Sequence, residues 1–84
     1  MTLFVSNLHY EQVDETFLRD LFAKYGQVVR VTLVRDRVTD KSRGFAFVEL
    51  TTEEDGTRAI SDLNKTKLHG RTLFVREAEE RKHV

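Results

Sequence analysis

The chain of 84 residues contains no cysteine, carries no net charge at neutral pH and has no long run of apolar residues. Without cysteine it can form neither disulfide bonds nor thiolate metal sites. No apolar stretch approaches the length needed to cross a membrane, and the N-terminus lacks the pattern of a secretory signal. We therefore expect a protein of the nucleus, the cytoplasm or both, with no membrane partner.

The composition is that of a globular domain. Apolar residues make up 39% of the chain and charged residues 33%, a balance that argues against disorder. A chain of this length buries one modest core. We predict a single domain over residues 1–78, followed by a charged, flexible tail at 79–84. The short length and the charged tail suggest a monomeric module of a larger protein.

Zero net charge hides an uneven distribution of charge along the chain. Acidic residues dominate segments 11–20 and 53–62, whereas basic residues dominate segments 30–43 and 64–76. If these segments fall on different faces, the protein has a dipolar surface despite its neutrality.

Hydrophobic periodicity predicts the element order βαββαβ. Alternating apolar residues indicate strands at 2–8, 28–34, 44–50 and 72–77. Helical spacing indicates one helix that begins after Asp14 and ends at a left-handed Gly26, and a second that begins after Thr52. Gly56 in the second helix suggests close packing against the sheet. A turn at 68–70 precedes the last strand.

Both amphipathic helices have to bury their apolar stripes on one face of a four-stranded antiparallel sheet. The result is a two-layer α/β sandwich of the ferredoxin-like, split-βαβ type. Strand parity assigns to the core face Leu3, Val5, Val31, Leu33, Ala46, Val48, Leu50, Leu73 and Val75. The opposite face, which no helix covers, carries Phe4, Phe45, Phe47, Phe74, Thr32, Val34, Glu49 and Arg76.

An uncovered sheet face with several phenylalanine rings predicts an interaction site. Planar rings suit unstacked nucleobases, and each stacked base contributes ~1–3 kcal/mol. Duplex bases are already stacked on each other, so the pattern favours a single strand. Basic residues near the rings, namely Arg35, Arg37, Lys41 and Arg43, can meet backbone phosphates.

Residues 43–50, "RGFAFVEL", resemble the eight-residue ribonucleoprotein signature of the RNA recognition motif family, K/R-G-F/Y-G/A-F-V-x-F/Y, at seven of its eight positions. Leu50 replaces the final aromatic and faces the core by strand parity. Residues 3–8, "LFVSNL", resemble the shorter signature of the family, and "DRVTDKSRG" and "LHGRTLFV" resemble its second loop and fourth strand. His9 and Lys65 stand where proline and glycine are common, which changes the shape of the loops.

The resemblance covers essentially the whole chain and implies single-stranded RNA binding without catalysis or cofactor, in a protein of RNA processing or mRNA regulation. By matching position, the resemblance implies that Phe4 and Phe45 stack on two successive bases, that Phe47 inserts between sugars and that Arg43 pairs with a phosphate; we expect all three rings to supply the stacking surface. The remaining predicted RNA-binding residues are Asn7, Arg37, Lys41, Glu49, Phe74 and Arg76.

Two other classes of function stay open at this point. The same fold can serve as a protein-interaction module, through the sheet face or through the helical face near Phe17. The polar tail 79–84 is a poor lid for the rings, which favours RNA. The split-βαβ architecture also hosts small hydrolases, but the sequence shows no nucleophile–base pair, metal cluster or phosphate-cradling glycine loop.

Three residues each permit two interpretations. Phe74 either extends the aromatic platform or fills the edge of the sheet. Phe17 either folds over the helix edge toward Leu21 or marks a protein-docking spot. Glu49 either accepts a hydrogen bond from an amino group of cytosine or adenine, or pairs with a cation such as Arg30.

Overall fold

The computed structural model describes residues 1–78, and the predicted tail at 79–84 lies outside the described residues. The elements in chain order are β1 (Thr2–Ser6), α1 (Glu15–Phe22), β2 (Val28–Arg35), β3 (Ser42–Leu50), α2 (Glu53–Leu63), β4 (Lys67–Leu68), β5 (Arg71–Thr72) and β6 (Phe74–Glu77). Within residues 1–78, neither helix is long and apolar enough to span a membrane.

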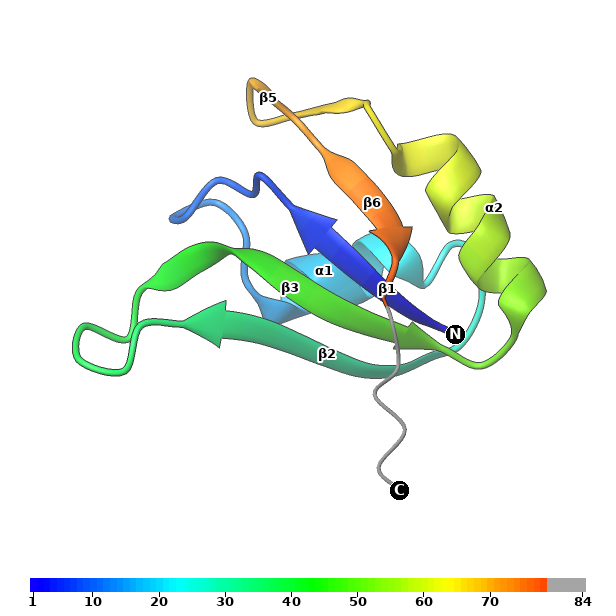
Figure 1. Ribbon diagram of the computed structural model, residues 1–84, viewed down its shortest axis with the longest axis horizontal. Coiled ribbons are helices and arrows are strands. Elements are labelled where there is room, and N and C mark those ends of the chain that lie inside the picture. Colours follow the sequence, from blue (N-terminus) through cyan, green and yellow to red (C-terminus); the bar gives the residue numbers. More distant parts are fainter. Residues whose placement is uncertain (79–84) are drawn as a thin grey trace.

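The main sheet is antiparallel and has the strand order β2-β3-β1-β6. Figure 1 shows the sheet in front, with α1 behind it and α2 along the side of β6, so that one face of the sheet stays uncovered. The predicted two-layer sandwich is therefore confirmed, with β6 as its fourth strand. The short strands β4 and β5 form a separate two-stranded ribbon.

The core lies between the sheet and the two helices. From the sheet, every predicted core residue is buried except Val31, which is half-buried: the buried set is Leu3, Val5, Leu33, Ala46, Val48, Leu50, Leu73 and Val75. Leu18 and Phe22 of α1 and Ala59 of α2 are completely buried. Leu50 is 1% exposed, so the position where the resemblance places an aromatic is filled by a core side chain.

Both helices begin where the sequence predicts. A carboxylate oxygen of Asp14 accepts a hydrogen bond from the backbone N–H of Phe17 at 2.8 Å, and the hydroxyl of Thr52 accepts from the N–H of Asp55 at 3.2 Å. Each contact satisfies one of the N–H groups that a helix start leaves unpaired. The carboxylate of Asp55 is paired with Arg58 instead of closing a reciprocal capping box.

The predicted end of the first helix is wrong. Helix α1 ends at Phe22, its C-cap Ala23 has right-handed backbone angles, and Gly26 has no positive φ. A Cβ at Gly26 would instead overlap the carboxylate of Asp55, so this glycine allows α2 to approach closely. Gly56 has the close packing that we predicted, although its neighbour is the side chain of Met1.

Two of the predicted strands are shorter in the structure. The first strand stops at Ser6 because Asn7 has a φ of 63°. The turn predicted at 68–70 is present, with positive φ at His69 and Gly70, but it belongs to the β4–β5 ribbon, so β6 begins later than predicted. Lys65, which replaces a common glycine, also has a left-handed φ of 68°.

Gly44 in β3 has a left-handed backbone conformation, with a φ of +86°. The register between β2 and β3 shifts next to it, which marks an irregularity in the strand. Its carbonyl accepts a hydrogen bond from the N–H of Leu8 at 2.9 Å, and a Cβ at this position would lie 3.3 Å from the carbonyl oxygen of Leu8. Gly44 thus lets the chain that leaves β1 approach β3.

We expect Gly44→Ala to destabilise the domain more than Gly70→Ala. Both substitutions place a side chain in the left-handed region, which costs ~1–2 kcal/mol. Only Gly44→Ala adds crowding against a backbone atom, because a Cβ at Gly70 meets nothing within 4 Å. Urea unfolding of both variants measures the difference, and equal free energies of unfolding would contradict the role of the Leu8 contact.

Candidate nucleic-acid interface

Three phenylalanine rings cluster on the uncovered face of the sheet. The β1–β3 register places Phe4 opposite Phe47 and Ser6 opposite Phe45. The ring centroid of Phe4 lies 5.7 Å from that of Phe45 and 5.4 Å from that of Phe47, with tilted planes. All three rings are half-buried, so they support each other and still present surface to solvent.

Two arginines lie against these rings. The guanidinium carbon of Arg76 is 4.6 Å from the ring centroid of Phe4, and that of Arg43 is 5.9 Å from the centroid of Phe45. Both distances suit cation–π attraction. A base that stacks on Phe4 therefore has to share the ring with Arg76 or displace it toward the phosphates.

Phe74 lies on the same face, on the edge strand β6. The β1–β6 register places it opposite Ser6, and its side chain is 45% exposed. The structure thus places Phe74 beside the three-ring cluster and does not bury it at the edge of the sheet.

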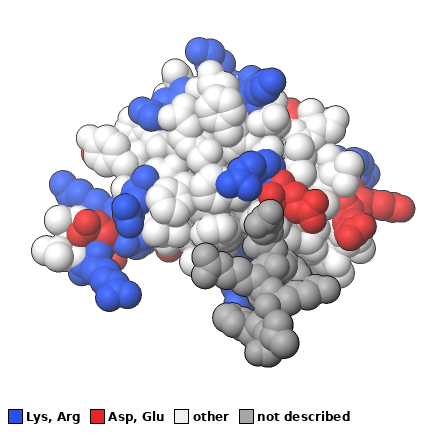
Figure 2. Space-filling view, in the orientation of Figure 1, with Lys and Arg blue, Asp and Glu red and all other residues white. Residues whose placement is uncertain are grey.

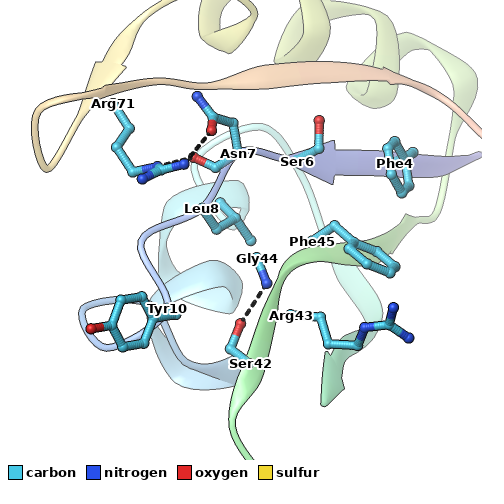
Figure 3. Close-up of a pocket in the computed structure, with 10 residues that line it drawn as sticks. All are labelled: Phe4, Ser6, Asn7, Leu8, Tyr10, Ser42, Arg43, Gly44, Phe45 and Arg71. Carbon is cyan, nitrogen blue, oxygen red and sulfur yellow. Dashed lines mark hydrogen bonds between the residues drawn. The ribbon is translucent and has the colours of Figure 1, made fainter. Parts of the chain in front are cut away.

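Hollows lined by residues 1–78 lie along this face. The first is lined by Phe4, Ser6, Asn7, Leu8, Tyr10, Ser42, Arg43, Gly44, Phe45 and Arg71, and Figure 3 shows it. The second is lined by Phe4, Phe47, Arg76 and Ala78. The third is lined by Thr2, Arg30, Thr32, Phe47 and Glu49. Because Phe4 or Phe47 belongs to each of them, the hollows form one continuous surface around the rings.

Asn7 joins the end of β1 to β5. Its amide nitrogen donates to the carbonyl of Thr72 at 2.7 Å, and its amide oxygen accepts from the guanidinium of Arg71 at 2.6 Å. Arg71 also donates to the backbone carbonyl of Asn7 at 3.2 Å. The sequence pattern did not single out Arg71 as a site residue, although it belongs to the basic segment 64–76.

The β2–β3 loop is held by Asp36, whose carboxylate accepts hydrogen bonds from the backbone N–H groups of Val38 and Thr39 at 2.8 and 3.0 Å. These bonds lower the pKa of Asp36. Arg37 and Lys41 are exposed on this ordered loop.

Arg35 does not join the other loop cations. Its guanidinium forms a salt bridge with Glu15 in α1 at 2.8 Å and donates to the carbonyl of Asp40 at 3.0 Å. The interpretation of Arg35 as a phosphate contact is therefore not supported, because its charge is already paired. The hydrogen bond from Arg35 lowers the pKa of Glu15 and raises that of Arg35.

Glu49 lies opposite Arg30 in the β2–β3 register. Among residues 1–78, however, the salt bridges are those of Arg35 with Glu15 and of Arg58 with Asp55. The predicted pairing of Glu49 with Arg30 is not formed, and the half-buried carboxylate faces the third hollow.

Figure 2 shows how charge is distributed over this side of the molecule. Much of the middle is uncharged apart from a basic and an adjoining acidic group right of the centre, Lys and Arg gather around an acidic group at the β2–β3 loop on the left and at the top near β5, and acidic groups gather on the right, toward α2. Basic and acidic groups therefore gather at different edges of this face. Within the described part of the chain, no group of three or more potential ligands is arranged to hold a metal ion.

The sequence model of the RNA recognition motif matches residues 3–73. The chain belongs to the RNA recognition motif family. It is 44% identical over 79 residues to the "Polyadenylate-binding protein, cytoplasmic and nuclear" of Chaetomium globosum, covering 94% of this chain and 10% of the relative. It is 43% identical over 79 residues to "Glycine-rich RNA-binding protein 3, mitochondrial" of Arabidopsis thaliana, covering 94% of this chain and 25% of the relative.

Solved structures agree with this assignment. The crystal structure of "RNA Binding Protein PG1" superimposes with a TM-score of 0.92 at 43% identity and covers 99% of both chains. The "Sxl-lethal protein/RNA complex" gives a TM-score of 0.85 at 37% identity and covers 92% of this chain and 47% of the other. Since relatives are described as cytoplasmic and nuclear or as mitochondrial, the nuclear or cytoplasmic location of this RNA recognition motif stays a prediction.

Phe17 of this RNA recognition motif is covered by the β4–β5 turn. The side chain is half-buried against the core, and its ring centroid lies 5.2 Å from that of His69. This arrangement agrees with the interpretation that Phe17 packs at the edge of the helix. The contact with His69 was not predicted from the sequence. It leaves less of the ring free for a docking partner.

We expect Glu15→Gln to lower the melting temperature slightly at pH 7 and not at low pH. The salt bridge with Arg35 depresses the pKa of Glu15 below its ordinary value of 4.5. The stabilisation is therefore fully present above pH 4.5 and is lost as the pH falls through the depressed pKa of the folded state. The effect is small because both side chains of the pair are still partly exposed to solvent.

Thermal unfolding of both proteins between pH 7 and pH 2.5 tests this expectation. The two melting temperatures should approach each other toward the acidic end, as Glu15 becomes protonated. A difference that persists there would show that the substitution acts through packing and not through the charge of Glu15.

Proposed function

We propose that this chain binds single-stranded RNA through the open face of its sheet. The observation that carries the proposal is the cluster of Phe4, Phe45 and Phe47, which stands on an uncovered face with Arg43 and Arg76 against its rings. Unpaired bases stack on such rings, whereas paired bases cannot reach them. The solved RNA complex of a relative with the same fold supports RNA over a protein ligand.

The cations around the rings supply the electrostatic part of binding. Arg43 and Arg76 already lie at the rings, and Arg37 and Lys41 extend from the β2–β3 loop. Each phosphate that they neutralise releases counterions, so affinity falls as salt rises, with a log–log slope of about −0.7 per phosphate.

Three further residues complete the proposed interface. Phe74 extends the stacking surface toward β6, since its ring is exposed beside Ser6. Asn7 lines the first hollow and contributes mainly by holding Arg71 in place. Glu49 accepts hydrogen bonds from a base in the third hollow.

The chain spans 10% and 25% of the two curated relatives described above. This coverage supports the role of an RNA-binding module within a longer protein, and the names of the relatives support a function in RNA processing or mRNA regulation. A protein partner on the helical face is less well supported, because the β4–β5 turn covers part of Phe17.

Loss of a ring and loss of a cation should weaken RNA binding in different ways. We expect Phe47→Ala to weaken binding of a random-sequence RNA octamer about tenfold or more, with an unchanged salt slope, because stacking contributes ~1–3 kcal/mol per base. We expect Arg43→Gln to reduce the salt slope by about 0.7, because one phosphate contact is lost. Fluorescence anisotropy titrations between 50 and 300 mM salt measure both quantities.

Matched variants separate these effects from damage to the fold. Phe47→Leu keeps an apolar side chain without a stacking surface and should resemble Phe47→Ala. Arg19→Gln removes the same charge from α1, where Arg19 donates to the carbonyl of Val28, and should bind like the wild type. Equal affinity of the wild type, Phe47→Ala and Phe47→Leu for RNA would contradict binding through this face.

Glu49 should favour bases that carry an amino group. A carboxylate only accepts hydrogen bonds, and cytosine and adenine offer an exocyclic amino donor, whereas uracil presents carbonyl groups beside its single N–H. We expect Glu49→Gln to reduce the preference for oligo(C) and oligo(A) over oligo(U) by about tenfold, since one good base contact contributes ~1–3 kcal/mol of discrimination.

The charge-matched control is Glu54→Gln, because Glu54 lies in the first turn of α2, in the helical layer. Removing either carboxylate raises the net charge by the same amount, so a general gain in affinity is common to both variants. Only a change in the ratio of affinities supports a contact between Glu49 and a base. The glutamine amide both accepts and donates, so it can also pair with the carbonyl groups of uracil, and an unchanged ratio in Glu49→Gln would contradict that contact.

A further inference from the structure

Tyr10 is an exposed aromatic residue outside the sheet. Its side chain is 56% exposed, and its ring stacks on that of His9 with a centroid distance of 5.4 Å and an interplanar angle of 8°. The imidazole of His9 is itself held, because its Nδ1 accepts from the backbone N–H groups of Glu11 and Gln12. The β1–α1 loop thus fixes one face of the Tyr10 ring and leaves much of the side chain open to solvent.

The ring of Tyr10 borders the first hollow of the RNA-binding face. Figure 3 shows Tyr10 at one edge of this hollow and Arg71 at another, with Gly44 between Tyr10 and the ring of Phe45. Because Gly44 has no side chain, no side chain fills the space between Tyr10 and Phe45 at this position. The hollow therefore continues the platform from the sheet toward the loop.

The hollow also has the charge that a nucleotide requires. None of the ten residues that line it is acidic, and two of them, Arg43 and Arg71, are cations. Arg71 is held by the neutral groups of Asn7, so its positive charge is not cancelled by those contacts. Beside the hollow, the hydrogen bond with the carboxylate of Glu11 raises the pKa of Tyr10 above its ordinary value of 10.0.

We propose that the hollow between Tyr10 and Arg71 is an additional nucleotide subsite, which holds the residue of the RNA strand that follows or precedes those on the sheet. This subsite rests on the proposed RNA-binding function. The base stacks on the open face of Tyr10, which His9 supports from behind, and the phosphate meets Arg71. Because the loop holds the ring in this orientation before RNA arrives, little conformational entropy is lost on stacking.

The length of the RNA provides the test. Short strands fill only the sheet, whereas longer strands also reach the subsite, so Tyr10 affects only the longer ones. We expect Tyr10→Ala to bind random-sequence RNA of three nucleotides like the wild type and RNA of eight nucleotides about fivefold to tenfold more weakly. Tyr10→Phe keeps the stacking ring and should match the wild type at both lengths.

Arg71→Gln provides an independent measurement of the phosphate contact. It should reduce the salt slope by about 0.7 for the octamer and leave the slope for the trimer unchanged. Amide chemical shifts recorded during the same titrations locate the contact, since residues 8–12 should shift with the octamer and not with the trimer. Affinities are measured by NMR for the trimer and by fluorescence anisotropy for the octamer.

The possible outcomes distinguish the subsite from the function on which it rests. If Tyr10→Ala binds RNA of both lengths like the wild type while Phe47→Ala binds weakly, the subsite is excluded and the RNA-binding face remains. If Tyr10→Ala weakens trimer and octamer equally, Tyr10 belongs to the main platform and the subsite is again excluded. If the wild type binds neither RNA, the proposed function fails and the subsite fails with it.

Discussion

The antiparallel pairing of β1 with β3 is the constraint on which the rest of the structure depends. These are the two central strands of the sheet, and their register decides which side chains share a face. It places Phe4 beside Phe45 and Phe47 on the open side, while Leu3 and Val48 meet on the core side. A shift of one residue would exchange the two sets and expose the core. Packing under the helices and aromatic clustering above them therefore enforce the same register.

The open face separates two tasks that usually compete in a small domain. Burial of leucine, valine and alanine against α1 and α2 stabilises the fold, so the phenylalanines on the other side are not needed to close the core. Their rings still cover each other in part, and Arg43 and Arg76 cover them further. These contacts reduce the apolar surface that the free protein exposes to water and leave it accessible to a partner that can replace them.

The arginine side chains also differ in their partners between the helical layer and the open face. Arg35 and Arg58 are paired with carboxylates of the helical layer, whereas Arg43, Arg71 and Arg76 contact rings or neutral amide and carbonyl groups. A neutral chain can therefore present cations on its open face, because several of its acids lie in the helical layer, namely Glu15 in α1 and Glu53, Glu54 and Asp55 in α2. The sum of charges says little about the partner, and their placement says more.

The sequence by itself determined the element order, the helix starts and the face on which each strand residue lies, because these follow from periodicity and capping over a few neighbouring positions. Only the tertiary structure decided the contacts between residues far apart in the chain. Arg71 meets Asn7 across 64 positions, Arg76 covers Phe4, and Gly26 makes room for Asp55 and does not end a helix. No local pattern encodes such contacts, since they arise when separate elements pack against the same core.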